Sequence, residues 1–207
     1  MKTVYKKIET WLEEKAGKII EFSLQKPATE DQINELEAVT GKKLPDDFKE
    51  LYFWHNGLND EENFGSLFYG MDFFPVERII SDHVSEQKNH PSEKIALIKA
   101  DRGIDPENMH NADWLKFAFD GSHTGLYLDL APAVDGKYGQ IIFIDHEYEV
   151  GILVADSTAE LVQNFQDDLE NSLYDLEEDA LEDGNHYLDT DPRIDIVNWE
   201  MSETWKR

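Results

Sequence analysis

The sequence predicts an α+β fold in which an antiparallel sheet meander is flanked by N-terminal and C-terminal helices. Between Trp114 and Ala155, four apolar or alternating runs are separated by short segments rich in Asp, Gly and Pro. Connections this short between successive strands favour antiparallel pairing. On both sides of this region the apolar residues follow a helical period that begins at capping residues. Of the 207 residues, 40% are hydrophobic and 12% aromatic, which is enough material for a packed core.

The N-terminal third contains three predicted helices. Residues 3–16 form an amphipathic pattern, and a short extended piece, Ile19–Leu24, is expected to follow it. Thr29 and Gln32 make a capping box for the next helix, which Gly41 is expected to end in a left-handed conformation. The third helix begins after Leu44 with a proline and two aspartates in its first turn and ends at Asn56-Gly57.

The central region is expected to hold one more helix before the sheet. Residues 75–84 have helical spacing, residues 85–94 read as a polar loop, and Ile95–Ile98 as a strand. The meander strands are predicted at Leu115–Phe119, Gly125–Leu130, Gln140–Asp145 and Gly151–Val154. Ser157 and Glu160 form a second capping box, and the helix that follows buries Leu161, Val162, Phe165 and Leu169.

The chain divides by charge near residue 165. We assign residues 1–165 to an α+β domain and residues 166–207 to an acidic extension that docks on the same domain. Within the extension, Leu169, Leu173, Leu176 and Ala180 have the spacing of one helix with a buried stripe and outward carboxylates. Residues 184–207 are expected to form either a docked strand and helix or a loosely held arm.

The 45 acidic and 19 basic residues give a formal net charge of −26, and residues 156–207 alone carry 16 acidic and three basic side chains. Such a field repels nucleic acid and anionic membranes, whose recognition needs Lys and Arg. It attracts basic proteins and speeds their association. The alternative is that the acidity only keeps the protein soluble. The charge therefore predicts a basic protein partner, with no nucleic-acid and no membrane partner; the oligomeric state stays open.

The sequence also limits the compartment. There is no cysteine, so disulfides and thiolate metal sites are excluded. No apolar run of signal-peptide length begins the chain, and no run approaches the ~20 apolar residues that span a bilayer. We expect a cytoplasmic protein.

Four segments, in this order, resemble the SUKH superfamily, which groups bacterial toxin-immunity proteins with a yeast regulator of cell-wall assembly. They are Ala28–Ile33 with Leu36-Glu37; Leu44-Pro45-Asp46-Asp47-Phe48 with His55-Asn56-Gly57; Trp114 with Phe119-Asp120-Gly121 and Leu128-Asp129-Leu130-Ala131-Pro132; and Gly139-Gln140-Ile141-Ile142 with Asp145-His146 and Ser157. Together they cover roughly residues 28–165.

The resemblance implies an α+β domain that binds and neutralises a cognate toxin, with an intracellular regulator or scaffold of the yeast type as the alternative. The recurrent positions it carries over are structural. Gly57 ends a helix, Trp114 is a core aromatic, Gly139 and Gln140 start a strand, and Pro45 and Asp129 belong to the same motifs. It brings no catalytic residue and no cofactor, so we expect a protein that is not an enzyme.

Residue types at the strand ends allow two other interpretations. Asp120, Asp129, Asp145 and His146 could together hold Mg²⁺ or Zn²⁺, but they lack a ligand spacing, and Asp beside a turn is more often hairpin chemistry. Ser122-His123 with a nearby Asp matches a nucleophilic triad by type alone, without a Gly-x-Ser-x-Gly elbow. We therefore predict no metal site.

The candidate toxin-binding residues fall into two groups. One is at the ends of the meander strands and comprises Asp120, His123, Asp145, His146 and Glu147. The other is in the acidic extension and comprises Asp167, Asp168, Glu177, Glu178 and Asp179. The extension could imitate the phosphates of nucleic acid in the basic cleft of a nuclease, or it could be a solvated, self-repelling surface.

Overall fold

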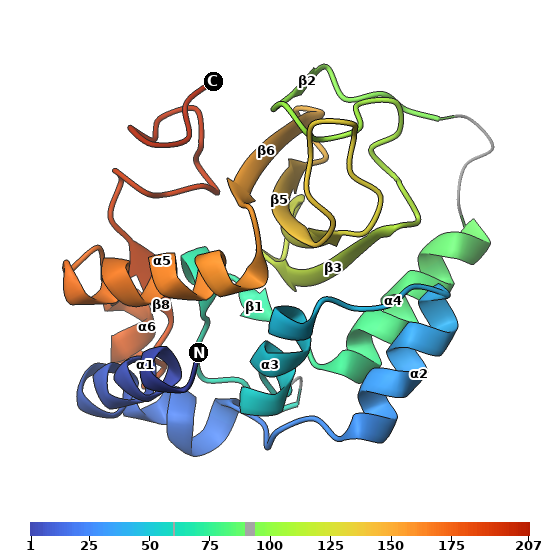
Figure 1. Ribbon diagram of the computed structural model, residues 1–207. Coiled ribbons are helices and arrows are strands. Elements are labelled where there is room, and N and C mark those ends of the chain that lie inside the picture. The colour runs from blue at the N-terminus through green and yellow to red at the C-terminus, as the bar shows by residue number, and fades with distance from the viewer. Residues whose placement is uncertain (60, 90–93) are drawn as a thin grey trace.

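A computed structural model describes residues 1–59, 61–89 and 94–207. Within these ranges the sheet has the strand order β1-β3-β4-β5-β6-β2, with helices on both sides of it in sequence (Figure 1). Its centre is the antiparallel meander β3 (Trp114–Phe119), β4 (Thr124–Asp129), β5 (Gln140–Asp145) and β6 (Val150–Ala155). The predicted α+β class and all four meander strands are confirmed.

The two edge strands are short and differ in direction. β1 (Asp72–Phe73) pairs antiparallel with β3, whereas β2 (Lys99–Ala100) pairs parallel with β6. The predicted strand Ile95–Ile98 is therefore wrong. Leu97 N–H donates to the Pro106 carbonyl and Ile98 N–H to that of Glu149, so this run bonds to loops before the chain reaches β6. Its side chains divide accordingly, because Leu97 is buried while Ile98 is 79% exposed.

The predicted N-terminal helices are present as α1 (Lys2–Lys15), α2 (Glu30–Thr40) and α3 (Asp46–Trp54). The Thr29 hydroxyl accepts from Gln32 N–H, the Gln32 side chain accepts from Thr29 N–H, and Gly41 has φ +66°. The extended piece expected at Ile19–Leu24 is instead a π-helical turn, Ile19–Ser23, closed by Leu24 N–H donating to the Ile19 carbonyl.

The fourth helix is longer than predicted. α4 spans Val76–Asn89, so the residues 85–89 assigned to a polar loop are its last turns, and residues 90–93 of that loop lie outside the described ranges. A short 3₁₀ turn at Phe68–Gly70 precedes β1. No helix in the described parts of the chain combines the length and apolar character needed to cross a bilayer.

After the sheet, α5 (Thr158–Glu170) begins at the predicted Ser157 cap. The Ser157 hydroxyl accepts from Glu160 N–H, but the Glu160 carboxylate bonds Asp156 N–H instead of completing the box. The single helix predicted to run on to Ala180 is wrong. Ser172 has φ +56°, and beyond it β7 (Tyr174–Leu176) pairs antiparallel with β8 (Leu188–Thr190), with α6 (Glu178–Glu182) between them.

Both faces of the central strands are buried. Ile141 and Phe143 of β5 join the large cluster formed with the helices, whereas Ile142 and Ile144 join a second cluster with Trp114, Leu97 and Met109. Alternate residues of a strand point to opposite faces, which explains why every residue of β5 is buried. The helices thus cover one face, and the segment around residues 97–109 covers the other.

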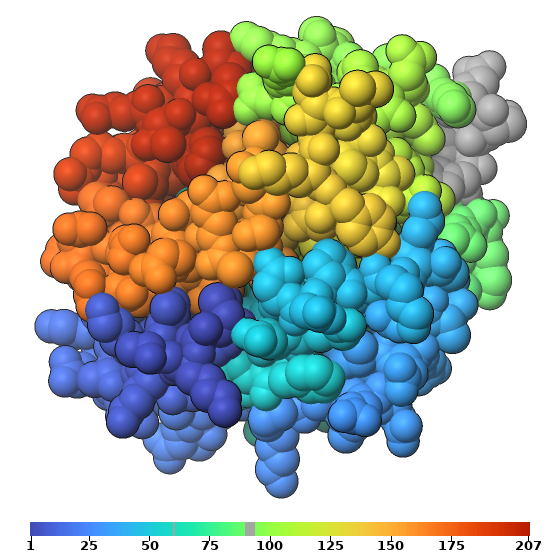
Figure 2. Space-filling model, viewed as in Figure 1, coloured from blue at the N-terminus to red at the C-terminus, as the bar shows by residue number. Residues whose placement is uncertain are grey.

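The C-terminal segment is docked against this core and is not a free arm. Ile194, Ile196 and Trp199 belong to the large cluster, and Trp205 Nε1 donates to the Ile194 carbonyl. Arg207 forms a salt bridge of 2.8 Å with Asp101. Figure 2 shows the orange part of the chain packed against α1 in dark blue, in agreement with the contacts between α1 and α5. Residues 184–207 contain the strand β8, as one of the two expectations had it. The helix expected to follow that strand is absent, and turns take its place.

Candidate protein-binding site

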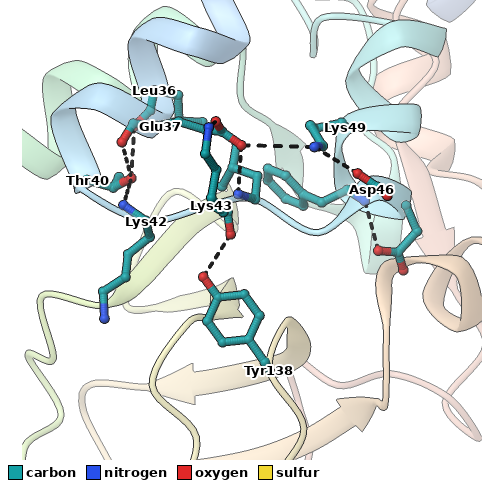
Figure 3. A network of polar contacts seen from close by, with 11 residues as sticks. Leu36, Glu37, Thr40, Lys42, Lys43, Asp46, Lys49 and Tyr138 are labelled. Atoms are coloured by element: carbon teal, nitrogen blue, oxygen red, sulfur yellow. Dashed lines mark hydrogen bonds and ion pairs between the residues drawn. The ribbon is translucent and has the colours of Figure 1, made fainter.

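Two of the family-like positions contact each other across the fold. Gly139, with φ +83°, packs so closely on the ring of Pro45 that an added Cβ would lie 2.4 Å from the proline Cγ. Beside it, the Tyr138 hydroxyl donates to the Lys43 carbonyl at 2.7 Å (Figure 3). The loop between β4 and β5 is thus held against the start of α3, and Pro45 and Gly139 are occupied in holding it.

The polar network at the start of α3 is satisfied internally. The buried Glu37 carboxylate accepts from Leu44 N–H at 3.0 Å and contacts Lys43 and Lys49 (Figure 3). Lys49 also pairs with Asp46 at 2.8 Å. The hydrogen bond from Lys43, followed by that from Leu44 N–H and the charge of both lysines, lowers the pKa of Glu37 despite its burial. This cluster fixes the α2–α3 connection and is not a free charged surface.

Asp129 and Gln140 form a buried pair at the base of the β4–β5 hairpin. Asp129 is fully buried and accepts from Ala131 N–H at 2.9 Å and from Gln140 Nε2 at 2.8 Å. Gln140 Nε2 also donates to the Gly103 carbonyl at 2.9 Å, which ties the hairpin to the segment covering the second face. Burial raises the pKa of Asp129. Trp114 lies in the second cluster next to this pair.

The strand-end group, comprising Asp120, His123, Asp145, His146 and Glu147, is assembled at one end of the sheet. Thr124 is the register partner of Asp145, and His146 N–H donates to the His123 carbonyl at 3.0 Å. His123 Nε2 lies 3.5 Å from the Glu147 carboxylate and 3.9 Å from that of Asp145. The two turns that carry the group therefore lie side by side.

Most of this group is occupied by contacts within the fold. Asp120 Oδ1 accepts from Ser122 and Thr124 N–H, and Asp145 Oδ1 accepts from Glu147 and Tyr148 N–H. Asp145 Oδ2 accepts from Trp199 Nε1 at 2.9 Å. Burial, with the neighbouring His110, lowers the pKa of His146 to about 4, so His146 is neutral at pH 7. Glu147 and the partly exposed His123 are what this group offers to a partner.

The hydrolase and metal interpretations gain little from this geometry. Ser122 Oγ lies 2.8 Å from His123 Nδ1, but Ser122 is exposed at a turn, and the nearby Asp145 Oδ1 already accepts two backbone amides. Within the described ranges, no three His, Asp or Glu side chains are placed to share a metal ion. The contacts favour turn stabilisation over catalysis.

The second predicted group belongs to the acidic extension, residues 166–207. Asp167 and Asp168 lie near the end of α5, while Glu177, Glu178 and Asp179 lie at the start of α6, where carboxylates complement the helix dipole. Glu177, Glu178 and Asp179 are all exposed. Two of the few basic residues here are already paired, Arg193 with Asp191 and Arg207 with Asp101. The extension is therefore a docked, exposed surface that keeps most of its negative charge.

The two groups do not form one site. β2 pairs with Val150 and Gly151, so the β5–β6 turn that carries Asp145, His146 and Glu147 lies beside β2, at the top of Figure 1. In the same view, α6 lies at the lower left, beneath α5. A partner that covered α6 would have to be large to reach the strand-end group. Because most of the strand-end group is occupied by contacts within the fold while Glu177, Glu178 and Asp179 are exposed, we treat the acidic extension as the candidate binding surface.

Sequence reasoning missed what α1 contributes to this surface. The helical spacing of Val4, Ile8, Trp11 and Leu12 predicts that all four lie on the buried face of the first helix, but of these only Ile8 and Leu12 are fully buried. Trp11 is half-buried and, with Lys15, lies next to the extension. The only indication in the sequence that Trp11 would be left partly exposed was its position at the edge of the apolar face of the helix.

Asp168 gives a prediction for stability against pH. Burial, followed by repulsion from Asp167, raises its pKa to about 6. A carboxyl whose pKa is raised on folding stabilises the fold while it is protonated, and that stability is lost as pH rises through the folded pKa. We expect Asp168→Asn to raise the free energy of unfolding by about 1–2 kcal/mol at pH 7.5 and to leave it nearly unchanged at pH 4.

Urea denaturation at both pH values measures this difference. Glu182→Gln is the control, because Glu182 is exposed, its replacement removes the same charge from the extension, and Glu182 is not a cause of the raised pKa of Asp168. An equal gain in both variants, or a gain for Asp168→Asn that does not depend on pH, would show that the effect is general repulsion and not the buried carboxyl.

Comparison with known proteins agrees with the family-like segments. The family model described as the SMI1 / KNR4 family (SUKH-1) matches residues 27–164, about two thirds of the chain. Among curated proteins, the cell wall assembly regulator SMI1 of Saccharomyces cerevisiae is 22% identical over 183 residues, covering 72% of this chain and 36% of the yeast protein. The glucan synthesis regulatory protein of Neurospora crassa is 22% identical over 242 residues, covering 98% of this chain and 45% of that protein.

A third relative, the cell wall biosynthesis/cell cycle regulator smi1 of Schizosaccharomyces pombe, is 22% identical over 188 residues, covering 84% of this chain and 37% of that protein. The chain thus spans less than half the length of these relatives. The family match runs from before α2 to the middle of α5, includes the hairpin with Asp129 and Gln140, and stops just before the acidic extension. This chain belongs to the SMI1/KNR4 family, also called SUKH-1.

Proposed function

We propose that this chain is a protein-binding domain that captures a basic protein on its acidic extension and catalyses no reaction. The observation that carries the proposal is that the acidic extension, residues 166–207 with 14 acidic and three basic side chains, is docked on the core with most of its acidic side chains exposed. A surface of one sign steers an oppositely charged partner towards it. Because this surface is already ordered, binding has a smaller entropic cost than binding by a disordered tail.

In its specific form, the partner is a toxin and the chain is its immunity protein. A basic nuclease-type toxin has the charge that this surface would complement. A direct test is co-expression with the toxin encoded by an adjacent gene. Survival of cells that carry both proteins, against death with the toxin alone, is the expected result. Equal killing in both strains would remove this function.

The second candidate is a regulatory or scaffold protein, and the observation that favours it is the description of the relatives as cell-wall and glucan-synthesis regulators. Deletion of the gene separates the two candidates. A cell-wall defect in a strain that has no toxin would support regulation, whereas a defect that appears only in the presence of the toxin would support immunity.

The dependence of the association rate on salt concentration gives a prediction that holds for either candidate function. Because exposed charges are screened over a Debye length of ~10 Å at 0.1 M salt, raising salt from ~0.05 to ~0.5 M should slow association ~10–1000-fold and change dissociation much less. Stopped-flow mixing with the partner measures both rates.

A matched pair of variants shows which surface is responsible. Neutralising Glu177, Glu178 and Asp179 together should slow association and flatten its salt dependence. Neutralising three exposed acids distant from α6, namely Asp31 and Glu35 of α2 together with Glu107, should have a smaller effect. Association that ignores salt in the unaltered protein would show that the acidic surface takes no part in recognition.

A further inference from the structure

A groove of about 690 Å³ lies between α1 and the β7–α6–β8 segment. Its apolar walls include the half-buried Trp11 and Leu181, whose exposed fraction of 43% makes it one of the more exposed large apolar side chains of the extension. Its acidic residues are Asp175, Glu178 and Asp189. The groove therefore combines an aromatic and aliphatic lining with three carboxylates.

Two of these carboxylates are placed at a cost to the fold. Asp175 and Asp189 are direct register partners on the antiparallel strands β7 and β8, and both are exposed. Like charges directly opposite each other on paired strands destabilise the sheet. In the described parts of the chain, no Lys or Arg forms a salt bridge with Asp175, Asp189 or Glu178, although Lys15 lines the same groove. The fold thus holds a repulsive pair beside a groove without neutralising it.

We infer that this groove binds an arginine side chain of the basic partner. This inference rests on the proposed function and identifies the residue type by which the partner is anchored. A guanidinium presents a planar fork of donors that can bridge two neighbouring carboxylates, and it stacks on aromatic rings. Asp175 and Asp189 supply the acceptors, Trp11 the ring, and Leu181 an apolar contact for the arginine stem. Binding would also remove the repulsion between β7 and β8, which is then a source of affinity.

The experiment uses the full chain and a fluorescent six-arginine peptide, titrated by anisotropy at ~0.15 M salt. Asp175→Asn combined with Asp189→Asn should weaken binding about tenfold or more, because two charged hydrogen-bond acceptors are lost. The control combines Glu107→Gln with Glu200→Gln, which removes the same charge from two exposed residues that do not line the groove. The control should weaken binding less than about threefold, through net charge alone.

Thermal unfolding separates binding from folding. Because the double asparagine variant loses a repulsive pair, its Tm should equal or exceed that of the unaltered protein while its binding is weaker. A lower Tm together with weaker binding would overturn the inference, since the carboxylates would then be structural. A six-lysine peptide should bind more weakly than the six-arginine peptide, and equal affinity would overturn the assignment to arginine.

The remaining outcomes distinguish the groove from the wider proposal. Equal weakening in the test and control variants would overturn the groove and leave capture by the acidic surface intact. If the unaltered protein binds the arginine peptide no better than an uncharged peptide, both the groove and the proposed function fail.

Discussion

Replacing Gly57 by alanine is expected to lower the free energy of unfolding by about 2–5 kcal/mol. Two effects add. Gly57 has φ +73°, a conformation that costs a residue with a Cβ about 1–2 kcal/mol. The new methyl group would also lie 2.4 Å from the Phe74 carbonyl carbon and the Pro75 nitrogen, so the backbone has to move. Overpacking of this kind adds about 1–3 kcal/mol, and more where the neighbour is main chain.

Gly41 is a matched control within the same protein. It has φ +66°, so Gly41→Ala carries the same conformational cost, but nothing lies within 4 Å of the position of its added Cβ. We expect Gly41→Ala to cost about 1–2 kcal/mol in urea denaturation. The difference between the two variants measures the close approach alone, and equal losses would show that φ, and not packing, governs Gly57.

The position of Gly57 explains why a collision there should spread. Gln25 N–H donates to the Gly57 carbonyl, and Leu58 N–H donates to that of Phe73, the last residue of β1. The preceding residue, Asn56, accepts from Val76 N–H at 2.9 Å and so caps α4. The segment that ends α3 therefore also sets the edge of the sheet and the start of α4. A shift at Gly57 would be felt by all three.

The parts of the fold that the sequence predicts are those in which local pattern and burial agree. Within β5 the four residues Ile141–Ile144 are continuously apolar, and a strand buried on both faces needs that pattern. Thr29 with Gln32 and Ser157 with Glu160 mark helix starts because an N-cap acts within one turn. These signals need no knowledge of distant residues.

The failures occur where a distant partner decides. The spacing of Leu169, Leu173, Leu176 and Ala180 satisfies a helix, yet the chain reverses at Ser172 because β7 can pair with β8 and bury Tyr174. Nothing in the local sequence predicts two aspartates facing each other across that pair, since such pairing is unfavourable on its own. Likewise, Leu97 and Ile98 are adjacent apolar residues, and only the loop contacts of Leu97 separate them.

The candidate site shows the same division. The strand ends bring Asp120, His123, Asp145, His146 and Glu147 together, but residue type does not reveal that turn amides and Trp199 already occupy the carboxylates of Asp120 and Asp145. Whether a carboxylate is free for a partner depends on its hydrogen bonds, which come from residues as distant as 54 positions along the chain. Composition locates charge, whereas contacts decide its availability.

Trp199→Ala is expected to destabilise the protein by about 3–5 kcal/mol, the usual cost of truncating a buried tryptophan. Trp199 is 7% exposed and lies in the large core cluster with Ile194 and Ile196. Its Nε1 donates a hydrogen bond to Asp145 Oδ2 at 2.9 Å. Because Asp145 is only 1% exposed, truncation of Trp199 also leaves a buried carboxylate oxygen without this donor. Met201→Ala, two residues along and 85% exposed, should change the free energy of unfolding by less than about 0.5 kcal/mol.

Two further measurements separate the hydrogen bond and the docking. Trp199→Phe keeps most of the apolar contact and removes the donor. The free energy of unfolding should therefore fall by about 1.5–3 kcal/mol, the range for a hydrogen bond to a charged group.

In Trp199→Ala, trypsin should cut after Arg193 faster than in the Met201→Ala control, because the docked segment opens more often. If Trp199→Ala unfolds at the unaltered midpoint but is cut rapidly, the segment is held independently of the sheet. A lowered midpoint with a single transition would instead show that the acidic extension and the family-like core unfold together. The stability of the proposed partner-binding surface would then depend on the core that the SMI1/KNR4 family shares.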